Sequence, residues 1–112
     1  MKNIQVDVQI FMIKKGDFYV AYAPALELSA YGPTMEEAQE DFGQVLRIFL
    51  EETTEAHTLT DVLLDLGWKL QRKPVAKYTP PVFNRNSIKS SKRLPQTSRF
   101  IKTERKPIRI PV

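Results

Sequence analysis

The first part of the chain alternates between apolar and polar positions in a way that predicts antiparallel strands. Every second residue from position 4 to position 12 is apolar: Ile4, Val6, Val8, Ile10 and Met12. A period of two is typical of a strand with one buried face. Gly16 suits the positive φ of a tight hairpin turn, so residues 18–23 are expected to return as the second strand. Residues 28–32 predict a third strand, which ends before Pro33.

The next segment follows the helical period. Thr34 and Glu37 form a capping-box sequence, in which each side chain can satisfy a backbone amide at the helix start. The apolar positions that follow gather within an arc of roughly 140° and are expected to pack on the sheet: Met35, Ala38, Phe42, Val45, Leu46, Phe49 and Leu50. A second, shorter helix is predicted between Thr58 and Gly67, and residues 68–72 alternate as a candidate fourth strand.

Residues 1–72 therefore predict an α+β domain, with a three- to four-stranded antiparallel sheet and two helices packed on one face. From residue 73 onward Pro, Ser, Asn, Lys and Arg dominate, and apolar residues form two short groups, 78–83 and 108–112. Such a composition buries too little apolar surface to fold alone. Residues 73–112 are accordingly predicted to be an irregular basic tail, disordered when free, in which residues 107–112 suit an edge strand.

Charge divides along the same line. Residues 1–68 hold four Lys or Arg against twelve Asp or Glu, a net charge of −8, whereas residues 69–112 hold thirteen against one, a net charge of +12. An acidic head suits a basic partner. The basic tail could contact nucleic acid, wrap an acidic surface on a partner or on its own head, or stay disordered. The residues considered for nucleic-acid contact are Lys89, Lys92, Arg93, Arg99, Lys102 and Arg105.

Residues with catalytic or metal-binding chemistry are scarce. The chain has no cysteine and a single histidine, His57, so a structural zinc site is not expected. The acids near the strands, Asp7, Asp17 and Glu27, are not spaced to converge on a magnesium ion. No phosphate loop or nucleophile elbow is present. We expect no enzymatic activity, no metal and no cofactor.

The sequence also lacks the signals of membrane insertion and export. No apolar run approaches the roughly 20 residues that span a bilayer, and polar residues interrupt the N-terminal segment where a signal peptide would be apolar. We expect a cytoplasmic protein without a membrane partner.

Two groups of residues could carry binding. On the second strand Tyr19 lies on one face and Val20 on the other. If the face of Val20 packs under the helix, Tyr19 points outward as an interface anchor; packing on the sheet surface is the alternative. On the first helix Glu36 and Glu40 are like charges four residues apart, which a basic partner would relieve; a solvated face is the alternative. The candidate partner-binding residues are Tyr19, Tyr31, Glu36, Glu40, Arg47 and Glu51.

The run YVAYAPALELSAYGPTMEEA, residues 19–38, resembles the signature of the HicB antitoxins. The shared features are a tyrosine-bearing strand, a step at Pro24, a short strand that ends at Gly32, and the sequence Thr34-x-x-Glu37-Ala38 at the start of a helix. The resemblance covers roughly residues 4–52. It implies a partial, catalytically silent RNase H-like domain that covers the active site of a small basic RNA-cleaving toxin of the HicA type. Many members of that family also carry a C-terminal DNA-binding module, which is not recognisable in this sequence.

Two functions follow from these observations. The first is the non-catalytic antitoxin of a type II toxin–antitoxin pair, which binds and occludes a HicA-like toxin. The alternative is a nucleic-acid-binding accessory protein that uses the basic tail, with the head as a dimerisation scaffold. A homo-oligomer is expected.

Overall fold

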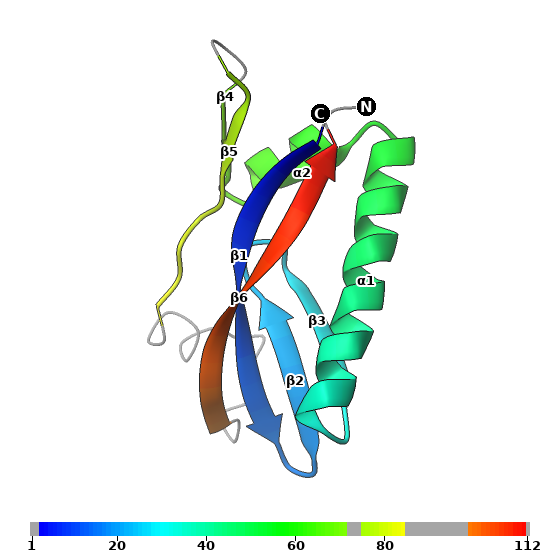
Figure 1. The fold of residues 1–112 in the computed structure, drawn as a ribbon, viewed down its shortest axis with the longest axis vertical. Helices are drawn as coiled ribbons and strands as arrows, with labels where there is room; N and C mark the ends of the chain where they lie inside the picture. Colours follow the sequence, from blue (N-terminus) through cyan, green and yellow to red (C-terminus); the bar gives the residue numbers. More distant parts are fainter. Residues whose placement is uncertain (1–2, 72–74, 85–98, 112) are drawn as a thin grey trace.

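The computed structural model describes residues 3–71, 75–84 and 99–111. Within them the main sheet has four antiparallel strands, β1 (Asn3–Lys15), β2 (Phe18–Ala23), β3 (Leu28–Gly32) and β6 (Arg99–Pro111), in the order β3-β2-β1-β6. Helices α1 (Met35–Glu55) and α2 (Leu59–Asp65) follow β3. A separate two-stranded ladder is formed by β4 (Lys69–Gln71) and β5 (Lys77–Thr79), on the side of β1 away from α1 (Figure 1). The predicted α+β class is therefore confirmed.

The strand β1 is the centre of the sheet. Its C-terminal part pairs with β2, and nearly its whole length pairs with β6, from Asn3 opposite Pro111 to Lys14 opposite Arg99. Because side chains alternate across a strand, Val8, Ile10 and Met12 enter the helix-side core, whereas Phe11 and Ile13 are buried on the other face.

Helix α1 begins where the capping sequence predicts. The hydroxyl of Thr34 accepts a hydrogen bond from the amide of Glu37 at 3.1 Å. Ala38, Phe42 and Leu46 are buried against the sheet, so the predicted apolar face of the helix is confirmed.

The helix approaches the sheet closely because the residues beneath it are small. Ala21 and Ala30 are both in the helix-side core. A Cβ atom on Gly32 would lie only 2.5 Å from the backbone nitrogen of Ala38. Glycine is therefore needed at this position for steric reasons, at the point where β3 passes under the first turn of α1.

Trp68 closes the core at the end of α2. The indole is only 3% exposed. Its Nε1–H donates a 2.7 Å hydrogen bond to the carbonyl oxygen of Ala25, which satisfies a buried polar group and ties α2 to the connection between β2 and β3.

The fourth strand of the main sheet is not the one expected. The candidate at residues 68–72 appears as β4, which pairs with β5 and stays outside the main sheet. The main sheet is completed by β6, and both β5 and β6 lie within the segment expected to be an irregular tail, so that expectation is wrong for residues 77–79 and 99–106. The expected edge strand at 107–112 lies within β6 as far as Pro111. Residues 72–74 and 85–98 lie outside the described part of the chain.

The physical reason is that β6 uses a core built by the rest of the chain. Ile108 lies opposite Val6 and Ile110 opposite Ile4, so both isoleucines enter the helix-side core and are almost fully buried. Tyr78 of β5 joins the same core. A segment with too few apolar residues to fold alone can thus fold by adding them to an existing core.

The opposite face of the sheet carries a second apolar cluster. Phe11, Ile13, Val20 and Tyr22 are buried there, and Phe83 and Phe100 pack against them. Gln9 fixes the backbone of Phe83 by two hydrogen bonds: its Nε2 donates to the carbonyl oxygen at 3.1 Å, and its Oε1 accepts from the amide at 2.8 Å. Phe83, in the segment that follows β5, therefore helps to cover the face of the sheet that the helices leave open.

Candidate interaction surface

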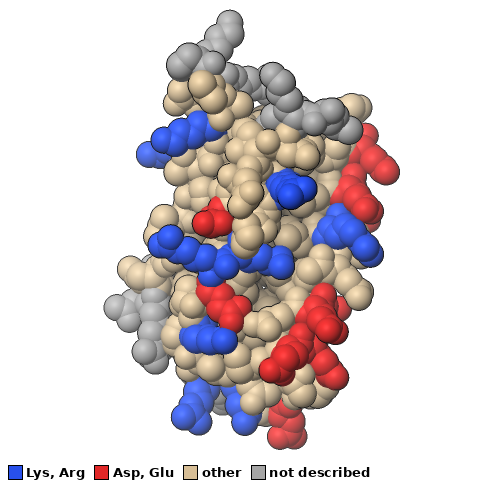
Figure 2. Space-filling model, in the orientation of Figure 1, with Lys and Arg blue, Asp and Glu red and all other residues tan. Residues whose placement is uncertain are grey.

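The solvent side of α1 is the most acidic surface of the described structure. The helix holds seven acidic residues, all exposed, and a single basic one, Arg47. Figure 2 shows acidic side chains along the edge of the molecule that α1 forms, with basic side chains over the strands. Glu36, Glu40, Arg47 and Glu51, the four helix residues predicted to bind a partner, are all exposed here.

Tyr19 is not placed as the outward-facing alternative requires. Ala21 and Ala23 form the face of β2 that lies beneath α1. Tyr19 is on the same face, where it is half-buried and packs against the helix-side core. Val20 belongs to the opposite face. The ammonium group of Lys14 lies 5.7 Å from the centre of the Tyr19 ring, within the range of a cation–π contact. Tyr19 therefore supports the sheet beside α1.

Tyr31 is exposed but is not brought together with the acidic helix. It lies opposite Val20, on the sheet face away from α1, and 56% of its surface is accessible. The structure thus groups the four helix residues on one surface and places the two tyrosines elsewhere.

Three of the six residues considered for nucleic-acid contact lie on β6: Arg99, Lys102 and Arg105. Lys89, Lys92 and Arg93 fall outside the described residues. Lys106 and Arg109 belong to the same strand. Because Gln9 pairs with Arg105 and Gln5 with Arg109, these two arginines lie on the face away from α1, about 13 Å apart at the usual rise of a strand.

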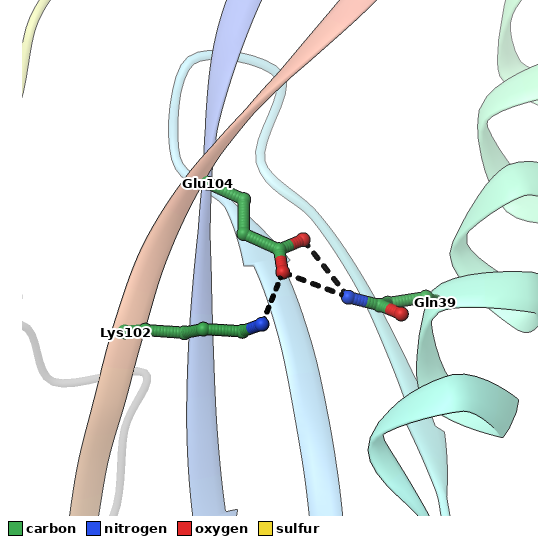
Figure 3. A network of polar contacts seen from close by, with 3 residues as sticks. All are labelled: Gln39, Lys102 and Glu104. Atoms are coloured by element: carbon green, nitrogen blue, oxygen red, sulfur yellow. Dashed lines mark hydrogen bonds and ion pairs between the residues drawn. The ribbon is translucent and has the colours of Figure 1, made fainter.

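A polar network joins β6 to α1 (Figure 3). Nε2 of Gln39 donates to both carboxylate oxygens of Glu104, at 3.0 and 2.9 Å, and the ammonium group of Lys102 lies 2.7 Å from Oε1. Gln39 and Glu104 border a cavity of about 340 Å³ between helix and strand, whose apolar lining includes Ile10 and Phe42. Sequence reasoning missed this network. The available signal was that Lys102, Glu104 and Lys106 continue the period-two pattern of Ile108 and Ile110 and so lie on the same face of one strand.

His57 lies just after the end of the first helix. It is exposed and follows the C-cap of α1 with a positive φ of 58°. Among the residues that the structure describes, no group of three or more His, Cys, Asp or Glu side chains could hold a metal ion. Within the same residues no helix is long and apolar enough to cross a membrane.

Comparisons of this chain with protein-family models, with curated proteins and with solved structures found no match. What the protein does must therefore be inferred from its own surfaces.

Proposed function

We propose that this protein is a non-catalytic binding protein, the antitoxin of a type II pair, which neutralises a small basic RNA-cleaving toxin of the HicA type in the cytoplasm. The observation that carries the proposal is the exposed side of α1, with seven acidic residues against one arginine. Charges of one sign on a rigid helix raise the association rate of a partner of opposite sign and discriminate against other partners.

The order of the elements supports the proposal independently of the charge. The run that resembles the HicB signature corresponds to β2, the turn that follows it, β3 and the first turn of α1. Both the proline step and the capping threonine lie at element boundaries. The acidic side chains of α1 begin at the end of this run and continue along the helix, on the face that the sheet leaves free.

Co-expression with the small basic protein encoded beside this gene tests the proposal. We expect that protein to arrest growth alone, and to be silent and co-purify when this chain is present. Exchanging the acids by Glu40→Lys and Glu51→Lys, both exposed on α1, should restore growth arrest and reduce recovery of the complex. A toxin that remains fully neutralised by this double variant would contradict the proposed surface.

The matched control is Asp17→Lys with Asp65→Lys. Both residues are exposed, one in the β1–β2 turn and the other at the end of α2, and the change in net charge is the same. Only the α1 variant should lose binding. If both variants lose it equally, the partner senses the total charge of the chain rather than the helix face. Failure to recover any small basic partner at low salt would remove the proposal.

Nucleic-acid binding is the second candidate, favoured by the cations that β6 brings together. Deleting residues 73–112 would not be a clean test, because it would also remove Ile108 and Ile110 from the core. Substitution of Arg105 and Arg109 by glutamine leaves the core face intact, and Lys69 and Lys77, exposed on β4 and β5, are the control pair.

For duplex DNA each lost phosphate contact lowers the slope of log K against log salt by about 0.9. The arginine pair should therefore reduce the slope by about 1.8 and the lysine pair should leave it unchanged. Binding that does not weaken with added salt would exclude this candidate.

A further inference from the structure

A second cavity among the described residues lies at the C-terminal end of α1, where that helix meets three other elements. Its volume is about 500 Å³. The end of α1, the start of α2, β5 and the last residue of β6 all contribute to its wall. The volume is in the range of small-molecule sites, and a pocket of mixed apolar and polar lining is the usual form of such a site.

The lining combines an apolar floor with hydroxyl groups. Leu59 and the ring of Tyr78 are buried and form part of the floor. Thr53, Thr54 and Thr60 supply side-chain hydroxyls. The hydroxyl of Thr54 is buried and has no hydrogen-bond partner among the described residues. An unpaired buried hydroxyl lowers stability, and a ligand with an N–H donor would provide the missing partner.

The backbone at the mouth is held in an unusual conformation. His57 closes the end of α1, where its amide donates to the carbonyl oxygen of Thr54 at 3.2 Å and that of Thr58 donates to Thr53 at 2.9 Å. The left-handed φ of 58° at His57 would be unstrained for glycine and costs stability for histidine. The strained residue therefore places the one imidazole of the chain at this cavity.

The charge around the cavity favours a cation. Among the described residues that line it, none is Lys, Arg, Asp or Glu, and His57 supplies the single imidazole. The end of a helix carries partial negative charge, α1 has no basic residue in its last turn, and Glu52 and Glu55 stand beside the lining threonines. Lys77 lies between two lining residues, Ala76, which precedes β5, and Tyr78 of β5, so the alternation of side chains directs it to the opposite side. The Tyr78 ring adds a surface that attracts cations.

We propose that this cavity binds an organic cation, a guanidinium or primary ammonium group on a short aliphatic chain. The aliphatic part would contact Leu59 and Tyr78, and the N–H donors would reach the threonine hydroxyls. The site lies at the C-terminal end of α1, and none of the four helix residues predicted to bind a partner lines it. It does not depend on the function proposed for the acidic side of the helix.

The test is an NMR titration of the isotopically labelled full chain with N-acetyl-arginine amide. N-acetyl-citrulline amide is the matched probe, because a neutral urea replaces the guanidinium in nearly the same shape. We expect saturable shifts confined to residues 53–60 and 76–78, and binding of the citrulline probe at least about tenfold weaker, as for hydrogen bonds that lose their charge. Equal affinity for the two probes, shifts elsewhere, or no saturable shift would overturn the proposal.

A pair of identical substitutions separates a binding role from a structural one. Thr54→Val removes the unpaired hydroxyl, whereas Thr58→Val makes the same change at an exposed position outside the lining, where the side chain caps no helix. Thr54→Val should raise the midpoint of urea unfolding and weaken binding of the arginine probe about tenfold. Thr58→Val should leave probe binding unchanged. A Thr54 variant that is more stable and binds as well as the wild type would refute the role of this hydroxyl and with it the site.

Discussion

Truncating Ile110 to alanine tests whether β6 is part of the cooperative fold. Ile110 has no exposed surface and lies opposite Ile4 in the helix-side core. The substitution removes three carbon atoms, and at about 0.8 kcal/mol for each the transfer term is about 2.4 kcal/mol. The cavity left behind raises the expected loss in the free energy of unfolding to about 2.5–4 kcal/mol. A domain with about 5–15 kcal/mol of stability remains folded after such a loss.

Urea unfolding measured by circular dichroism gives this value, and Ile101→Ala is the control. Ile101 belongs to the same strand, but it is 37% exposed and lies where the β1–β6 register shifts. Its truncation should cost less than about 1 kcal/mol. Both variants should keep the wild-type dependence on urea. If Ile110→Ala is no more costly than the control, β6 separates from the core before global unfolding, and its placement in the cooperative unit is refuted.

Three further substitutions test local features. Gly43→Ala should stabilise the protein by about 1 kcal/mol in urea unfolding, because the position is helical and an added Cβ would meet nothing within 4 Å. Gly32→Ala should destabilise it by about 1–3 kcal/mol, because the new Cβ would collide with the backbone of Ala38; a neutral result would show that α1 can move away. Trp68→Phe should lower the free energy of unfolding by about 1–3 kcal/mol, because the carbonyl oxygen of Ala25 loses its hydrogen-bond donor. Urea unfolding measures this loss, and near-UV circular dichroism checks that the packing of the other aromatic side chains is unchanged.

The elements encoded by nearby residues could be predicted from the sequence. The helical arc of α1 and the hydroxyl of Thr34 at its start are both local signals, and both are found in the structure. The four residues of α1 that were predicted to bind a partner could be placed on one surface for the same reason. The helical repeat fixes the relative directions of their side chains.

The choice of sheet face could not be predicted from β2 alone. Both of its faces are apolar, and Val20 and Tyr22 on one face are larger than Ala21 and Ala23 on the other, which favours the first face as the core. The helix packs instead on the alanine face, where small side chains allow a close approach. The larger residues are covered by Phe83 and Phe100, which are distant in sequence. That coverage decides the orientation of Tyr19, and no local pattern contains it.

The strand β6 was missed for a related reason. Its N-terminal part carries charged residues on the helix-facing side, Lys102, Glu104 and Lys106, because α1 does not cover this part of the sheet closely. Composition alone therefore suggests a disordered tail. What orders the segment is the free edge of β1, a feature of the folded head.

The position of β6 changes the meaning of the charge division. The basic residues of this strand do not extend away from the acidic head, because β6 lies across a cavity from α1 and is joined to it through Gln39 and Glu104. Glu104, the only acid after residue 68, also compensates Lys102 at 2.7 Å. A uniformly basic partner would gain energy against α1 and lose it against β6. The surface therefore favours a partner whose own charge is patterned, basic where it meets the helix and neutral or acidic where it meets the strand, and this arrangement provides specificity that a simple excess of acidic residues would not.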